Sequence, residues 1–183
     1  FPVTSEQLFP EFIGESPRII ELKRLIHKYS KSDLPILILG ESGTGKSLLA
    51  KLIHKYSKES QNPFFEENMA TIPETLAEAT LFGTKKGAFT GAETRIGLIE
   101  AACGGTLFLD EITETSLGIQ AKLLRFISEK AYRSLGDTRE KQAKVRLITA
   151  SNINIIEAVK YKFFREDLYY RISPLTIELP TLN

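Results

Sequence analysis

Eight consecutive residues in the first third of the chain have the types and spacing that bind phosphate groups. They read Gly40-Glu41-Ser42-Gly43-Thr44-Gly45-Lys46-Ser47 and match the pattern GxxxxGK[ST] between an apolar run and a helix-like run. The glycines let backbone N–H groups surround phosphates at the positive end of a helix. Lys46 would reach the β- and γ-phosphates, and the Ser47 hydroxyl would ligate Mg²⁺. We predict a nucleoside triphosphate site, with a chance match in an ordinary loop as the alternative.

Two adjacent carboxylates, Asp110 and Glu111, follow the apolar run 106–109. Such a pair at the end of a strand is often only a solvated turn. Beside a phosphate loop, Asp110 would complete the Mg²⁺ shell with Ser47, and Glu111 would accept a proton from the water that attacks the γ-phosphate. The pair therefore predicts hydrolysis as well as binding. No asparagine in the chain precedes a lysine, as a guanine-specific Asn-Lys-x-Asp motif requires, so ATP is favoured over GTP.

A third stretch, residues 87–92, places an aromatic ring between glycines. It reads Gly87-Ala88-Phe89-Thr90-Gly91-Ala92, and further glycines stand at Gly83 and Gly97. Each glycine inside a helix costs about 1 kcal/mol relative to alanine, so the segment is predicted to be a loop. An ordinary mobile loop is one interpretation. The other is a contact loop that presents Phe89 to a partner.

The runs that must position these groups alternate between strand-like and helix-like patterns. Strands are expected at 35–39, 63–67, 106–109 and 145–150, with a strand-like run at 175–179. Helices are expected from Pro17, capped by Ser16, and at 46–56, 73–81 and 117–127. This alternation indicates an α/β fold with a parallel sheet covered on both faces and ligands at the carboxyl ends of the strands.

Length and composition limit the ligands and the cellular compartment that we expect for this chain. The length of 183 residues suits one globular core. The 24 basic and 23 acidic residues give a net charge of +1, which predicts no direct binding of nucleic acid. We expect no signal peptide. The chain contains no apolar run of about 18 residues, so no membrane partner is expected. The lone Cys103 lies in the apolar run 99–109 and is expected to be a buried, inert thiol in a cytoplasmic protein.

Taken together, these stretches resemble the AAA+ ATPase domain of bacterial enhancer-binding proteins, the NtrC-like activators of RNA polymerase that carries sigma-54. Further matching stretches are Ile13-Gly14-Glu15-Ser16, Leu81-Phe82-Gly83, 120–126, Arg133-Ser134-Leu135-Gly136 and 164–171. The resemblance covers nearly the whole chain. It implies a linker at 1–12 and, at 13–183, a P-loop NTPase of the AAA+ type whose α/β subdomain holds a parallel five-stranded sheet flanked by helices.

The resemblance also implies roles at the nucleotide. Ile13 and Gly14 would line the adenine pocket, and Leu48 would extend the nucleotide-binding loop. Asn68 would contact the catalytic Glu111 and relay the state of the γ-phosphate.

Three residues late in the chain match further family positions. Asn152 would sense the γ-phosphate, although a residue that only turns the chain after a strand is the alternative. Arg165 and Arg171 would be arginine fingers that enter the neighbouring subunit's site. For one of them, a structural pairing with Glu166 or Asp167 on its own helix is the alternative.

Fingers that act in trans imply a homo-oligomeric ring, usually a hexamer in this family. The loop residues Gly87, Ala88, Phe89, Thr90, Gly91 and Ala92 would contact sigma-54, and hydrolysis would move the loops to remodel the closed promoter complex. The chain departs from the family at Thr84, Met69 and Gly118, where histidine, cysteine and an acidic residue are usual, but none of these is a catalytic group. The helical lid and any DNA-binding domain would lie beyond Asn183.

Two other classes of function stay open at this point. One is another AAA+ remodelling ATPase with an unrelated target, for which Phe89 and Thr90 would be dispensable. The other is a nucleotide-binding module that no longer hydrolyses, for which Glu111→Gln would leave turnover at background.

Overall fold

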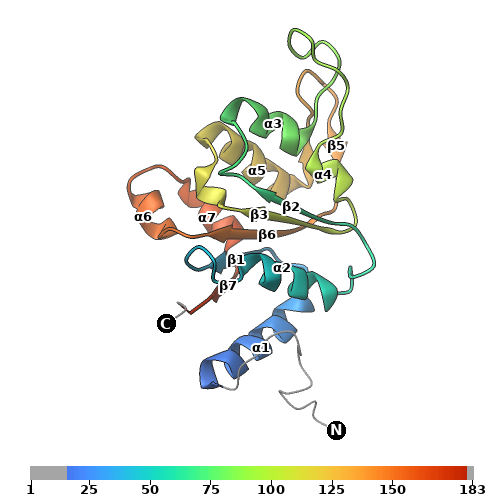
Figure 1. The fold of residues 1–183 in the computed structure, drawn as a ribbon. Helices are drawn as coiled ribbons and strands as arrows, with labels where there is room; N and C mark the ends of the chain where they lie inside the picture. Colours follow the sequence, from blue (N-terminus) through green and yellow to red (C-terminus); the bar gives the residue numbers. More distant parts are fainter. Residues whose placement is uncertain (1–15, 181–183) are drawn as a thin grey trace.

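The centre of the computed structural model, which describes residues 16–180, is a five-stranded parallel sheet (Figure 1). Its spatial order is β2-β3-β6-β1-β7, and every neighbouring pair is parallel. The strands are β1 (Ile36–Leu39), β2 (Phe64–Asn68), β3 (Thr106–Asp110), β6 (Arg146–Ser151) and β7 (Leu175–Glu178). The predicted α/β class and parallel sheet are confirmed.

Seven α-helices are found in the described part of the chain. They are α1 (Pro17–Ser30), α2 (Lys46–Lys55), α3 (Glu74–Phe82), α4 (Leu98–Ala101), α5 (Leu117–Glu129), α6 (Ile155–Lys160) and α7 (Glu166–Ile172). A 3₁₀ turn, η1 (Ile112–Glu114), follows β3, and a short hairpin is formed by β4 (Ala131–Tyr132) and β5 (Lys141–Gln142). No helix among residues 16–180 is both long and apolar enough to cross a bilayer.

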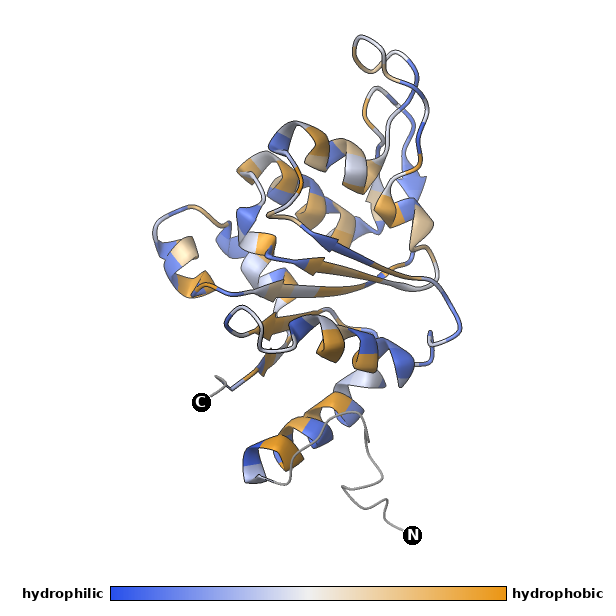
Figure 2. Cartoon of the chain, in the orientation of Figure 1, coloured by the Kyte–Doolittle hydropathy of each residue, from blue (hydrophilic) through white to orange (hydrophobic). Residues whose placement is uncertain are grey.

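The sheet separates two hydrophobic cores because successive strand residues face opposite sides. Ile36 and Ile38 pack with α1 and α2 on one side, while Leu37 packs with α3, α5 and α7 on the other. In Figure 1, α1 and α2 lie below the sheet and α3, α4 and α5 lie above it. Figure 2 shows apolar residues along the central strands β3, β6 and β1, as expected for strands buried on both faces, whereas the edge strand β2 is largely hydrophilic.

A local capping signal accounts for the start of α1, and a tertiary contact accounts for its end. The Ser16 hydroxyl accepts from the N–H of Ile19, and Pro17 occupies the first helical position, as predicted. At the other end the buried guanidinium of Arg146 on β6 donates to the carbonyls of Tyr29 and Ser30, at 2.6 and 3.0 Å. A cation therefore satisfies carbonyl groups that the helix itself leaves unpaired.

The structure differs from the sequence-based expectation in two respects. Element ends shift by one or two residues, and η1, α4, α6, α7 and the β4–β5 hairpin have no counterpart among the predicted ranges. The prediction for Cys103 is wrong, because this residue is exposed. The apolar run 99–109 is broken by a turn after α4, in which Ile99 and Ala102 take the buried positions and Cys103 points outward.

Candidate active site

The phosphate-loop sequence joins β1 to α2 and has the backbone geometry that its glycines allow. Gly43 and Gly45 have φ of +80° and +94°, a left-handed conformation that strongly favours glycine. Gly45 caps α2, so the helix presents its unpaired N-terminal N–H groups to this loop. Glu41, Ser42 and Gly43 are exposed, and Leu48 is 45% exposed on the first turn of α2. The loop is therefore open to an incoming anion.

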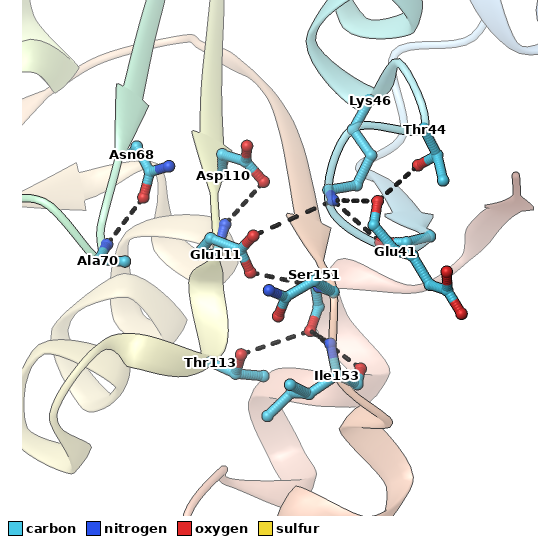
Figure 3. Close-up of polar contacts among 12 residues, drawn as sticks. Glu41, Thr44, Lys46, Asn68, Ala70, Asp110, Glu111, Thr113, Ser151 and Ile153 are labelled. Atoms are coloured by element: carbon cyan, nitrogen blue, oxygen red, sulfur yellow. Dashed lines mark hydrogen bonds and ion pairs between the residues drawn. The ribbon is translucent and has the colours of Figure 1, made fainter. Parts of the chain in front are cut away.

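Lys46 lies within the loop rather than in solvent. Its side chain is buried, and Nζ donates to the carbonyls of Gly40 at 2.9 Å and Glu41 at 3.0 Å. The same ammonium is 4.0 Å from Oε1 of Glu111 (Figure 3). Lys46 thus connects the phosphate loop on β1 to the carboxylate pair that follows β3.

Asp110 and Glu111 follow one another but have different environments. Asp110 ends β3, and its Oδ1 accepts from the N–H of Glu111 at 2.9 Å. Glu111 has φ of +52°, in the left-handed region, at a cost of about 1–3 kcal/mol for a residue with a side chain. This strained backbone turns the Glu111 side chain back toward the end of the sheet, where Oε2 accepts from the N–H of Asn152 at 3.2 Å.

The electrostatics of Glu111 suit a proton acceptor. Burial raises the pKa of its carboxyl above the ordinary value of 4.5, and the neighbouring Asp110 adds to the rise. The N–H of Asn152 and the ammonium of Lys46 oppose it. A general base is most effective when its pKa approaches the working pH, so the direction of this shift favours proton abstraction from water.

The expected contact between Asn68 and Glu111 is absent from this structure. Asn68 ends β2 directly beside Asp110, in register with it, but its Oδ1 accepts from the N–H of Ala70 at 2.9 Å. The turn that follows β2 therefore occupies the side-chain oxygen. The bond to Glu111 comes from the backbone of Asn152 instead, and the Asn152 side chain is exposed.

A cavity of about 580 Å³ opens beside the phosphate loop. It is lined by Gly40, Glu41, Asn152 and, from the other side, Tyr169 and Leu179. This volume lies within the range of small-molecule sites in proteins. The predicted adenine-pocket residues Ile13 and Gly14, like the linker 1–12, lie outside the described residues.

The residues predicted to hold Mg²⁺ offer oxygen donors only, as this ion prefers. Ser47 lies on the first turn of α2, and Asp110 lies at the end of β3. No group of three or more His, Cys, Asp or Glu suited to a metal ion occurs within residues 16–180. A site with few protein ligands fits Mg²⁺, which is usually bound through one or two carboxylates together with substrate phosphates.

The two candidate finger arginines belong to α7 and are not bonded to the phosphate loop. Arg165, at the N-cap of α7, forms two hydrogen bonds with the Asp167 carboxylate, at 3.0 and 2.8 Å. Arg171 is exposed, and its Nε donates to Ser128 Oγ at 3.2 Å. Arg165 thus forms the alternative pairing with Asp167 on its own helix. Arg171 bonds a serine hydroxyl and forms no ion pair with a carboxylate within residues 16–180.

One supporting residue had no role assigned from the sequence. Gln120 is fully buried in α5, where its amide donates to the carbonyls of Thr115 and Phe163 and accepts from the N–H of Arg165 at 2.8 Å. It therefore fixes the start of α7, which carries both arginines. The sequence signal that could have identified Gln120 is an amide side chain within the apolar stripe of a predicted helix.

The segment 87–92 forms the tip of a loop that projects from the top of the molecule in Figure 1. Phe89 is 53% exposed and Thr90 is exposed, whereas Ala92 is buried. Gly87 and Gly91 have φ of +87° and +80°, so both turns at the tip favour glycine. The glycines thus let a short loop carry an exposed aromatic ring.

This loop lies beside the loop of the β4–β5 hairpin. The N–H of Lys85 donates to the carbonyl of Leu135 at 2.9 Å, and Lys85 Nζ lies 3.3 Å from Asp137. A Cβ added at Gly136 would lie 2.5 Å from the Ala88 Cβ, so Gly136 permits the close approach. Thr84, one of the departures from the family, pairs its backbone with Arg95 at the base of the loop.

The fold and this site together define a P-loop NTPase. The strand of the phosphate loop, β1, is separated by β6 from β3, and the carboxyl ends of these three strands bring together Lys46, Asp110, Glu111 and the backbone of Asn152. The chain belongs to the Sigma-54 interaction domain family, whose model matches residues 12–178.

Individual relatives agree with this assignment. The chain is 44% identical over 175 residues to the transcriptional activator RocR of Bacillus subtilis, covering 96% of this chain and 38% of RocR. It is 47% identical over 174 residues to a Nif-specific regulatory protein of Azospirillum brasilense, covering 94% of this chain and 28% of the relative. Among solved structures, NtrX of Brucella abortus in complex with ADP superposes with a TM-score of 0.87 at 32% identity, over 93% of this chain and 37% of NtrX. The chain thus spans well under half the length of these relatives.

Proposed function

We propose that this domain hydrolyses ATP and uses the energy to move the loop 87–92 against sigma-54 in the RNA polymerase closed complex. Solved structures of NtrX, a relative of the same family, contain ADP or ATP, which supports nucleotide binding by this chain. In the whole protein the output would be activation of transcription.

The chemistry we propose uses groups that meet at the carboxyl ends of β1, β3 and β6. The phosphate loop and Lys46 bind the β- and γ-phosphates, and Glu111 takes the proton of the attacking water. Ser47 and Asp110 would hold Mg²⁺, which supplies positive charge against the phosphate oxygens. Asn152 holds the Glu111 carboxylate through its backbone N–H.

The observation that carries the proposal is the position of the exposed loop in the chain, between two neighbouring strands of the sheet. The whole segment from α3 to α4, with the loop between them, connects β2 to β3, and these two neighbouring strands end in Asn68 and Asp110. The segment leaves β2 directly after Asn68, at the edge of the sheet that holds Asp110, and returns through α4 to the start of β3 at Thr106. A displacement at Asn68 would therefore pass into the first anchor of the loop, α3. This arrangement supports coupling between the nucleotide and the tip at Phe89 and Thr90.

A ring with sites completed in trans is part of the same proposal. Arg165 at the N-cap of α7 and Arg171 on α7 are bonded to Asp167 and Ser128 and not to their own phosphate loop, so a neighbouring subunit's nucleotide would be their target. We propose a homo-oligomeric ring, a hexamer by family resemblance. Asn68 would relay the state of the γ-phosphate by forming, when nucleotide is bound, the contact with Glu111 that this structure lacks. DNA would be contacted only through a domain outside this chain.

Two substitutions in the full-length protein test the proposal when ATP hydrolysis and open-complex formation are measured in parallel. Thr90→Ala should leave hydrolysis near the wild-type rate and abolish open-complex formation, because it alters the exposed tip far from the nucleotide. Lys46→Ala should abolish nucleotide binding and both activities.

A matched pair controls for exposed apolar surface. Phe89 and Ile96 belong to the same loop and are 53% and 66% exposed, but Ile96 lies outside the 87–92 stretch. Phe89→Ala should abolish open-complex formation, and Ile96→Ala should largely preserve it. Normal activation of a sigma-54 promoter by Thr90→Ala and Phe89→Ala would refute the contact role and favour a remodelling ATPase with another target.

A further inference from the structure

Glu66 on β2 binds the Ser47 hydroxyl, the predicted Mg²⁺ ligand of the phosphate loop. Ser47 Oγ donates to Glu66 Oε1 at 2.5 Å, and Lys51 Nζ on α2 lies 3.0 Å from the other carboxylate oxygen. The Glu66 carboxylate thus bridges Ser47 on the first turn of α2 and Lys51 one turn later. The sequence patterns considered above gave Glu66 no role.

Strand register explains why Glu66 faces the nucleotide site. Glu66 pairs with Phe108 on β3, and Asn68 pairs with Asp110, two residues later on both strands. Phe108 packs in the core on the α1 and α2 side of the sheet. Because alternate residues share a face, Glu66 and Asp110 lie on the side from which α2 approaches.

A serine that ligates Mg²⁺ uses an oxygen lone pair and still carries its proton. That proton needs an acceptor, since a half-buried O–H without a partner is costly. An ionised carboxylate is a strong acceptor, and it also restricts rotation of the Ser47 side chain. The ion pair with Lys51 in turn holds the carboxylate in place.

We propose that Glu66 is a positioning residue for Mg²⁺: it binds the Ser47 proton and leaves the oxygen lone pairs directed to the site beside Asp110. This inference rests on the proposed function, in which Mg²⁺ is bound with the nucleotide. Partners that orient a ligand from outside the coordination shell commonly change metal affinity by about 10- to 100-fold when they are mutated.

The sign of the effect distinguishes this role from its alternatives. If the Ser47–Glu66 bond competed with metal binding, removing Glu66 would strengthen Mg²⁺ binding. If Glu66 were only half of a surface ion pair with Lys51, its removal would leave Mg²⁺ binding unchanged. Of these three roles, only positioning predicts weaker binding, and the Glu66→Gln and Glu67→Ala variants separate it from direct ligation and from general electrostatics.

The experiment measures the Mg²⁺ concentration that half-saturates the full-length protein carrying a non-hydrolysable ATP analogue, by calorimetry. Glu66→Ala should raise this concentration by about tenfold. Glu66→Gln, whose amide oxygen still accepts a hydrogen bond, should recover most of the loss. Affinity for the analogue in EDTA should stay at the wild-type value, which separates a metal effect from a folding or nucleotide effect.

Glu67→Ala is the matched control. Glu67 has the same charge and is the next residue on β2, but it pairs with Leu109 and therefore faces the opposite side of the sheet. Its removal should leave the Mg²⁺ dependence unchanged. If Glu67→Ala weakened Mg²⁺ binding as much as Glu66→Ala does, the cause would be general electrostatics, and the inference would be overturned.

Ser47→Ala separates the inference from the proposed function. If Ser47→Ala weakens Mg²⁺ binding and Glu66→Ala does not, the positioning role fails and the metal site stands. If Ser47→Ala has no effect, the predicted metal site itself is wrong, and the inference fails with it. Lys51→Ala provides a second test, with a smaller expected loss in the same direction, should Glu66→Ala not fold.

Discussion

Glu111 combines burial, backbone strain and a hydrogen bond in a single residue. Its φ of +52° is held by contacts at both ends: its N–H donates to Asp110 and its carboxylate accepts from Asn152. Strain of this kind persists only where the surrounding structure enforces it, and it concentrates at functional sites. The geometry thus supports the role predicted for Glu111 from its place after Asp110.

Replacement of Glu111 by glutamine should preserve binding of ATP and slow its hydrolysis. Glutamine keeps the size and the acceptor for the Asn152 N–H but cannot take a proton from water, so the rate should fall by about 10²- to 10⁴-fold. Single-turnover hydrolysis and ATP affinity, measured together, check this. Glu114→Gln, an exposed residue on η1, is the matched control and should change neither.

The pH profile gives an independent test of the same residue. Burial raises the pKa of Glu111 above 4.5, and the base acts only when it is ionised, so the rate should fall on acidification with a midpoint above that value. The Glu111→Gln variant should lack this acid limb. An acid limb that persists unchanged in Glu111→Gln would show that Glu111 is not the titrating base.

At the scale of elements, a polar contact ties α4 to the β4–β5 hairpin. Glu100 on α4 accepts from Lys141 Nζ on β5 at 2.8 Å and from the hydroxyl of Tyr132 on β4 at 3.1 Å. Burial raises the pKa of Tyr132, so its hydroxyl stays a donor. The base of the proposed contact loop is therefore fixed to a hairpin from a distant part of the sequence.

Removal of the Glu100 carboxylate should destabilise the domain in a pH-dependent way. The hydrogen bond from Lys141 lowers the pKa of Glu100 below 4.5, so its contribution is present above that pH and is lost as the pH falls through the lowered pKa. Glu100→Ala should lower the free energy of unfolding by about 1 kcal/mol at neutral pH, since the group is partly exposed.

Denaturant unfolding at several pH values measures this difference between Glu100→Ala and wild type. The difference should shrink on acidification. Glu129→Ala, which removes an exposed pair with Arg125 on one helix, is the control and should change stability less. A difference that is constant down to strongly acidic pH would mean that the ionised carboxylate of Glu100 contributes nothing.

The elements differ in how well the sequence predicted them. The strands β1 and β3 were predictable because each contains a continuous apolar run, and α1 because Ser16 and Pro17 mark its start. The strands β4 and β5 have two residues each and α4 has four, which is too short for any periodicity to be visible. The strands β4 and β5 are stabilised by pairing with each other, and α4 by the burial of Ile99 in the core, rather than by local preference.

At the scale of the whole molecule, the proposed ring predicts complementation between two inactive variants. Subunits with Arg165→Ala keep Glu111, and subunits with Glu111→Gln keep Arg165. In mixed rings, about a quarter of the interfaces at a 1:1 ratio would join an intact site to an intact finger, so some hydrolysis should return.

The measurement is ATPase rate against mixing ratio, with mixed rings verified independently. Because Arg165 is paired with Asp167 in this structure, Arg171→Ala in place of Arg165→Ala tests which arginine is the finger. Absence of recovery at every ratio in verified mixed rings, for both arginines, would indicate that each site is completed within one subunit.

The sequence by itself determined the local chemistry of this protein. The phosphate loop, the Asp110–Glu111 pair and the glycine-rich stretch 87–92 depend on residues adjacent in the chain, so their types and spacing were enough to predict them. Only the tertiary structure decided which distant groups complete them. The N–H of Asn152 reaches Glu111, Glu66 reaches Ser47, and Gly136 admits Ala88. The Asn68 side-chain oxygen accepts from the turn after β2, and Asn68 forms no hydrogen bond with Glu111 in this structure. These contacts depend on strand order, register and the exposure of each residue, which arise from packing of the whole chain rather than from any local pattern.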